Sequence, residues 1–240
     1  MPNSVYALYL IGFLPSFIWL LFYLKKDKHP ESNRMVIKIF IYGMVAAVAA
    51  ILLEKQYQNT VHSYLNANGI KTAALLLILS GAIIEETVKY AAVWLGALRN
   101  KELDEPVDVM LYLIIAALGF AALENILVLA RFSPLLSGSK ALEVSFWRFI
   151  SATFLHALCS GTLGYWVAIS FCRRKAKWLY VFIGLGISIG LHGVYNWSIM
   201  EMSGAEKLLL PIIILIALGC LAGYWFKKLK KLKSVCLIKP

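Results

Sequence analysis

Charged residues are scarce in this chain. Of its 240 residues only 15% are Asp, Glu, Lys or Arg, whereas 60% are hydrophobic. A typical soluble domain carries about 25% charged residues, so the composition excludes an ordinary water-soluble protein. Short segments of alternating apolar and polar residues, the pattern of a membrane β-barrel, are also lacking. The class that remains is a bundle of apolar helices in a membrane.

Long apolar stretches, in contrast, are abundant. Each is near the roughly 20 residues that a helix needs to cross the hydrocarbon core. Seven of them lie at about residues 4–24, 35–53, 72–98, 109–131, 146–172, 178–199 and 207–226. We therefore expect an all-α, polytopic transmembrane bundle of about seven spans, with residues 1–240 forming one integral-membrane domain.

Acidic residues are scarcer than basic ones. The chain has 13 Asp and Glu against 24 Lys and Arg, a formal net charge of +11. Such an excess is typical of a nucleic-acid binder, but here the basic residues gather after the first, third and fifth stretches and in the tail at 227–240. The positive-inside rule then predicts an outside N-terminus and a cytoplasmic C-terminus, with a lipid bilayer and no nucleic acid as partner. The tail is compatible with contact to anionic lipid and with plain solvation.

A few polar side chains interrupt the apolar stretches. Arg148 lies near the outer end of its stretch and is expected to extend to the membrane surface. Others lie deeper, on four consecutive stretches: Glu85, Glu86 and Lys89; Glu124 and Asn125; His156 and Ser160; His192 and Asn196. Charge inside a membrane is costly, so such residues indicate a functional site. Gly186 and Gly190 form a G-x-x-x-G pair, which predicts close approach of another helix.

The spacing of the deeper residues puts them on common helix faces. Residues four apart lie on the same side of a helix, as do Glu85 with Lys89, His156 with Ser160, and His192 with Asn196. In the predicted orientation, and with about 1.5 Å per residue, Glu124, His156 and His192 lie about 10 to 15 Å below the outer ends of their stretches. The glutamate pair lies near the midplane, so all four stretches can contribute to one pocket in the outer half of the bilayer.

A pocket with three acids and one lysine has an excess of negative charge. A bound proton, a cationic histidine, a metal ion or entering water has to compensate for it, and each arrangement favours proton transfer. We expect Glu85 or Glu86, helped by His156, to activate a water molecule. His192 and Asn196 are expected to stabilise the oxyanion that forms when water attacks a peptide carbonyl.

The other members of the set are expected to support this chemistry. Lys89 holds the glutamate pair electrostatically, while Glu124 and Asn125 either orient a histidine or bind a metal. The candidate metal ligands are Glu85, Glu86, Glu124, His156 and His192. These groups suit zinc, but an H-E-x-x-H motif is absent, so a metal-free glutamate–histidine mechanism is slightly favoured.

Each of these residues also has a structural explanation when taken alone. Glu85 and Lys89 are explained as an ion pair, His156 as a packing histidine, and Asn125 and Ser160 as interhelical hydrogen-bonding residues. The whole set is harder to explain in this way, because helix packing does not require two adjacent carboxylates. We therefore favour a functional site.

Four short motifs contain these residues. They are E-E-x-x-K at 85–89, F-x-x-x-E-N at 120–125, H-x-x-x-S at 156–160 and H-x-x-x-N at 192–196. In this order, within residues 82–197, they resemble the PrsW family of intramembrane proteases, which is related to the type II CAAX prenyl endopeptidases and to bacteriocin-processing membrane proteases.

The resemblance implies a multi-pass protease of a bacterial plasma membrane. Its substrate would be a single-pass anti-sigma factor, whose site-1 cleavage activates an extracytoplasmic-function sigma factor in a stress response. The resemblance also implies catalytic or essential roles for Glu85, Glu86 and His192, supported by Glu124, His156 and Asn196.

Two departures from the CAAX relatives leave other functions open. Those relatives carry an arginine four residues after the second glutamate, where this chain has Lys89 three after Glu86, and a histidine where this chain has Glu124. His156 is the candidate to replace that histidine. The alternatives are a prenyl-peptide protease, whose site would open to the cytoplasm, and a non-catalytic scaffold or transporter with a buried polar site.

Overall fold

The computed structural model describes the chain except for residues 1, 27–28, 66–69, 101, 133–137 and 233–240. Its helices are α1 (Pro2–Leu24), α2 (Asn33–Leu65), α3 (Ile70–Gly96), α4 (Pro106–Phe132), α5 (Gly138–Ile150), α6 (Ala152–Cys172), the short 3-10 helix η2 (Arg174–Ala176), α7 (Lys177–Glu201) and α8 (Glu206–Lys231). The described part contains no strand. The prediction of an all-α polytopic bundle is therefore confirmed.

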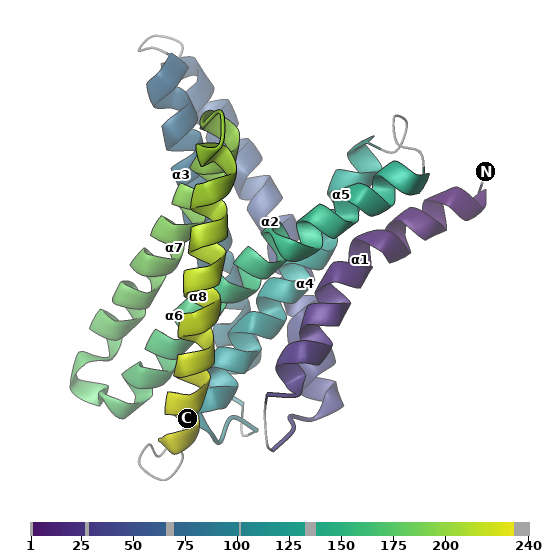
Figure 1. The fold of residues 1–240 in the computed structure, drawn as a ribbon. Helices are drawn as coiled ribbons and strands as arrows, with labels where there is room; N and C mark the ends of the chain where they lie inside the picture. The colour runs from purple at the N-terminus through teal and green to yellow at the C-terminus, as the bar shows by residue number, and fades with distance from the viewer. Residues whose placement is uncertain (1, 27–28, 66–69, 101, 133–137, 233–240) are drawn as a thin grey trace.

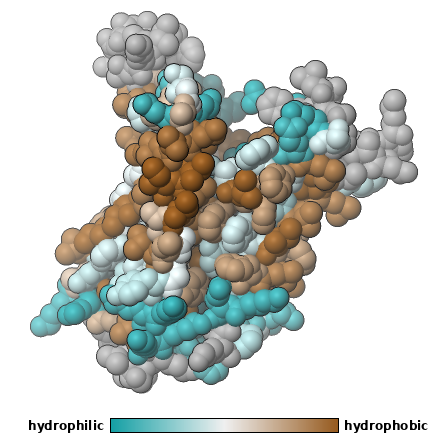
Figure 2. Space-filling view, in the orientation of Figure 1, coloured by the Kyte–Doolittle hydropathy of each residue, from teal (hydrophilic) through white to brown (hydrophobic). Residues whose placement is uncertain are grey.

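In the described part of the chain, five helical segments are long and apolar enough to cross a membrane: Asn33–Val61, Pro106–Arg131, Ser139–Cys172, Lys177–Glu201 and Glu206–Lys231. A shorter apolar segment, Tyr9–Leu24, lies in α1. α3 has 27 residues, the same length as α4, but it carries three charged residues in its second half. Large apolar side chains are exposed on α2, α7 and α8. Figure 2 shows such side chains over the middle of the molecule and hydrophilic ones at its lower edge.

Helix α4 forms the centre of the bundle and packs against α1, α2 and α6. Every residue from Val107 to Leu118 is at most 1% exposed. Two glycines allow α2 and α4 to touch, because a Cβ on Gly43 would lie 2.0 Å from the Ala116 carbonyl oxygen, and one on Gly119 would lie 2.0 Å from that of Phe40. The central helix thus holds its neighbours at backbone contact.

The G-x-x-x-G prediction in α7 was wrong for the described part of the chain. A Cβ on Gly186 or Gly190 would meet no described atom within 4 Å, and both residues are exposed. The pattern identifies small residues but does not say which side of the helix meets a neighbour.

Two of the predicted stretches have different extents in the structure. The fifth stretch is divided at Ser151, whose backbone angles (φ −120°, ψ −89°) are not helical. The part before this division is α5, which begins at Gly138, eight residues before the predicted stretch. Its Ser145 hydroxyl donates to the Ile11 carbonyl of α1 at 2.8 Å.

Helix α2 continues to Leu65, twelve residues past the predicted end, because its polar second half contains neither Gly nor Pro to stop it. In Figure 1, α5 and α6 cross the bundle obliquely relative to α8, and the described ends of the chain lie at opposite ends of the molecule.

Candidate active site

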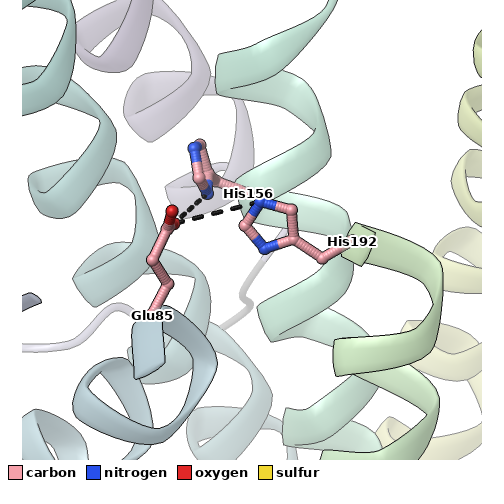
Figure 3. Close-up of side chains that lie close together, drawn as sticks. All are labelled: Glu85, His156 and His192. Carbon is pink, nitrogen blue, oxygen red and sulfur yellow. Dashed lines mark ion pairs between the residues drawn. The ribbon is translucent and has the colours of Figure 1, made fainter. Parts of the chain in front are cut away.

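Polar side chains from α3, α4, α6 and α7 meet inside the bundle. Glu85, His156 and His192 point toward one another in Figure 3. Glu85 Oε2 lies 3.8 Å from His156 Nδ1 and 3.9 Å from His192 Nε2. Three residues far apart in the sequence therefore share one centre, as their predicted depths required.

Glu86 is fully buried behind this centre. Its Oε1 accepts from Lys89 Nζ at 2.8 Å and from His192 Nδ1 at 2.9 Å. Its Oε2 accepts from the hydroxyls of Ser188 at 2.9 Å and Ser160 at 3.3 Å. Four donors surround both oxygens, so Glu86 orients His192 and has little capacity left for a substrate.

Lys89 supplies positive charge to the cluster and is also fully buried. Its ammonium donates to Glu85 at 3.3 Å and to Glu86 at 2.8 Å, and it lies 2.8 Å from His156 Nδ1. An ammonium has only donors, so Nδ1 of His156 is the acceptor in this contact. The ring of Phe120 covers the same ammonium, with its centroid 4.3 Å away.

The hydrogen bonds fix the proton positions on both neutral histidines. Since His156 accepts at Nδ1, its proton is on Nε2, which donates to Glu124 Oε2 at 2.9 Å. His192 donates from Nδ1 to Glu86, so its Nε2 carries a lone pair. His192 therefore turns a lone pair toward Glu85, whereas the lone pair of His156 accepts from Lys89, and each ring holds a carboxylate with its other nitrogen.

Arg148 was not predicted to belong to the site, but the structure places its guanidinium group against it. Its side chain is 18% exposed, and its Nη2 lies 3.1 Å from Glu124 Oε2. Its Nε donates to Asn125, whose amide in turn donates to Thr153 at 3.0 Å. Arg148 thereby connects α5 to the carboxylate that holds His156.

The sequence analysis missed two further residues of the site, Ser188 and Tyr195, although their spacing from His192 puts both on its helix face. Ser188 lies four residues before His192 and so shares its helix face. Tyr195 lies three residues after His192 and is only 2% exposed. Asn196 lines the cavity described next. The predicted residues are therefore together, but Asn125 binds Arg148 and Thr153 rather than a histidine.

A cavity of about 370 Å³ opens beside the cluster, between α4, α5, α6 and α7. Glu85, Glu124, His156 and His192 form part of its polar wall, whereas Glu86 does not line it. The other walls are largely apolar: Val128, Val144, Trp147, Leu155, Ile199 and Met200. The cavity lies near the C-terminal end of α7, away from Lys177. The distribution of basic residues predicts that this end is on the outer side of the membrane.

The residues of the centre suit a metal ion. Glu85, His156 and His192 each offer one ligand atom, and these atoms lie within 4.8 Å of one another. Two imidazoles and a carboxylate form a known zinc ligand set, and a carboxylate on the second nitrogen is the usual way to orient a metal-binding histidine. Here Glu124 and Glu86 provide these carboxylates. Because Lys89 contacts the same nitrogen of His156, His156 can bind a metal only after the ammonium has moved away.

Comparisons with known proteins identify the family. The family model described as PrsW family intramembrane metalloprotease matches residues 31–222. Protease PrsW of Geobacillus kaustophilus is 30% identical over 180 residues, which cover 75% of this chain and 73% of the relative. Protease PrsW of Clostridioides difficile is 28% identical over 213 residues (87% and 86%), and that of Bacillus subtilis is 25% identical over 221 residues (91% of each).

No solved structure matches the chain significantly. The family match includes the four helices α3, α4, α6 and α7 that supply the cluster, and the alignments with the relatives cover most of the chain. The resemblance noted in the sequence is therefore confirmed. The chain belongs to the PrsW family of intramembrane metalloproteases, and it is a multi-pass membrane peptidase of the bacterial type.

Proposed function

We propose that this protein cleaves a single-pass anti-sigma factor in the outer half of the plasma membrane, and so activates an extracytoplasmic-function sigma factor. The observation that carries the proposal is the cavity, in which Glu85 and two imidazoles face a space with mostly apolar walls. Such a space suits a short unwound segment of a membrane protein. Its position, at the end away from the basic connections, disfavours a prenylated cytoplasmic tail as substrate.

Glu85 is the better candidate for the base. It lines the cavity and its side chain is 15% exposed, whereas Glu86 is fully buried and surrounded by donors. In the proposed mechanism Glu85 takes the proton of the attacking water. Glu86 acts through others: it fixes Lys89 beside Glu85 and turns His192 toward the cavity.

The hydrogen bonds also favour a metal ion over the metal-free mechanism. His192 Nε2 carries a lone pair and His156 Nδ1 accepts from Lys89, so neither neutral ring can donate to an oxyanion at the centre. His156 can join a metal once the Lys89 ammonium has moved away. We propose that His156, His192 and Oε2 of Glu85 hold a zinc-like ion, which would supply a Lewis acid for the scissile carbonyl and its water, while Oε1 of Glu85 takes the proton of that water. Glu124 and Arg148 keep His156 in the required tautomer.

The test is reconstitution in liposomes with a single-pass anti-sigma factor. Wild type is compared with Glu85→Gln and with the control Glu143→Gln. In the described part of the chain, the Glu143 carboxylate is exposed and pairs with exposed Lys140. We expect cleavage by wild type and control, and a loss of about 10²- to 10⁴-fold in Glu85→Gln. Unchanged cleavage by Glu85→Gln would remove its assigned role.

Metal content is measured separately. The purified wild type is assayed by elemental analysis and by cleavage after chelation and after addition of zinc. Bound metal, and activity that falls on chelation and returns with zinc, support the metal site. Full activity in a metal-free sample contradicts it and leaves the metal-free alternative.

A further inference from the structure

The wall of the cavity contains a buried hydroxyl that the cluster does not use. The phenol hydroxyl of Tyr195 is buried and makes no hydrogen bond with the described part of the chain. Ser151 is close enough to interact with this hydroxyl, and its oxygen has lone pairs to offer although its own proton goes to the Trp147 carbonyl oxygen, but the two hydroxyls do not meet hydrogen-bond geometry in this structure. Arg148 Nη2, on the facing helix, is also buried and has no hydrogen bond of normal geometry to described residues, although it is close to Glu124.

An orphaned hydroxyl of this kind needs an explanation. Leaving a buried polar group without a partner costs about 1–3 kcal/mol, and the exceptions in native proteins often mark a ligand or catalytic site. Tyr195 is 2% exposed and lines the cavity together with Glu85 and His192. The missing partner is therefore expected to enter through the cavity.

The position of Tyr195 identifies the chemistry of that partner. Tyr195 lies three residues from His192 on α7, so the two side chains share a helix face, one turn apart. At the centre, Glu85 and His156 accept from Lys89, and His192 Nε2 carries a lone pair, so neither imidazole directs a proton into the cavity. Peptide hydrolysis needs the opposite chemistry next to it, namely a donor for the carbonyl oxygen on which negative charge develops.

We propose that Tyr195 is a catalytic residue, whose phenol donates a hydrogen bond to the scissile carbonyl oxygen of the substrate. The assignment rests on the peptidase activity of the proposed function. In it the water attacks the carbonyl carbon and gives a proton to Glu85, the carbonyl π electrons move to the oxygen, and the phenol holds that oxygen without losing its own proton. Arg148 lines the same cavity and adds positive charge on the facing wall. The group that Tyr195 binds is thus a carbonyl oxygen of the substrate's peptide backbone.

The test is Tyr195→Phe, which removes only the hydroxyl. Removing one oxyanion donor typically lowers kcat by about 10²- to 10³-fold, so we expect a loss of that size with KM little changed. The melting temperature in detergent should stay the same or rise, because the variant no longer buries an unpaired hydroxyl. The matched control is Tyr180→Phe, a half-buried tyrosine that stacks on Trp166 away from the cavity and should keep the wild-type kcat.

Three results would overturn the assignment. An unchanged kcat would show that the hydroxyl does not contact the reacting oxygen. A raised KM with an unchanged kcat would make Tyr195 a residue for ground-state binding. A fall in melting temperature and activity together would make it structural. The assays use both an anti-sigma factor and an internally quenched apolar peptide, so that a wrong substrate for the protein is distinguished from a wrong role for Tyr195.

Discussion

Glu85 and Glu86 are adjacent in the sequence, yet their carboxylates have different surroundings. Glu86 has four donors and no exposure, whereas Glu85 has one hydrogen bond, from Lys89, and faces the cavity. Successive residues on a helix point about 100° apart, so only one of the two can face the cavity. The difference separates a group that can meet the substrate from a group that organises the site.

This difference predicts unequal effects on stability. Glu86→Gln removes the charge that balances Lys89 inside the bundle, and losing one partner of a buried pair costs about 3–5 kcal/mol. We therefore expect Glu86→Gln to lose cleavage activity and to unfold at lower denaturant concentration than wild type. Glu85→Gln should lose activity with little change in stability. Unfolding in detergent, followed by circular dichroism, gives the comparison, and equal stability of both variants would contradict it.

Sequence spacing could identify most residues of the site but not their roles. The i, i+4 pairs correctly placed Glu85 beside Lys89. The sequence did not separate the two glutamates, because both are compatible with a polar helix face. It also missed Tyr195 and Arg148. Tyrosine is common in membrane helices without any special role, and Arg148 joins the site through a backbone break at Ser151 that hydrophobicity does not reveal.

At the scale of the helix, backbone contact between α2 and α4 positions the site. Phe120 on α4 covers Lys89, and the next residues on that helix include Glu124, which holds His156. Gly119 touches the Phe40 carbonyl one residue before Phe120. A change in the spacing of α2 and α4 would therefore move both contacts.

A glycine substitution tests this contact. Gly119→Ala places a Cβ 2.0 Å from the Phe40 carbonyl oxygen, so the two helices must separate. We expect a clear fall in melting temperature and a loss of cleavage activity. Gly190→Ala is the control, since its Cβ meets no described atom within 4 Å and alanine favours a helix by about 1 kcal/mol over glycine. A Gly119→Ala protein as stable as the control would mean that the contact is not needed.

Helix positions could be predicted from the sequence better than helix ends and contacts. Apolar length located α4, α7 and α8 to within a few residues. The extension of α2 and the division between α5 and α6 depend on packing beyond the apolar stretch. The G-x-x-x-G pattern failed for the same reason, because side-chain size does not state which face has a neighbour.

For the whole molecule, the orientation in the membrane is still a prediction. The N-terminus is expected outside and the C-terminus inside, because alternate connections hold most basic residues. Reporter fusions test this: green fluorescent protein at the C-terminus should fluoresce, and alkaline phosphatase there should be inactive. After residue 202, between α7 and α8, the same phosphatase should be active. The reverse pattern would place the cavity at the cytoplasmic face and revive the prenyl-peptide alternative.

The dispersal of the site over four helices has a consequence for biosynthesis. Glu85 enters the membrane early, but its partner groups follow with α4, α6 and finally α7, which brings His192. Lys89 accompanies both glutamates on α3, but until that last helix has inserted the nascent chain holds no complete site. A ribosome-bound intermediate is therefore inert toward neighbouring membrane proteins, and proteolytic competence arises only near the end of translation.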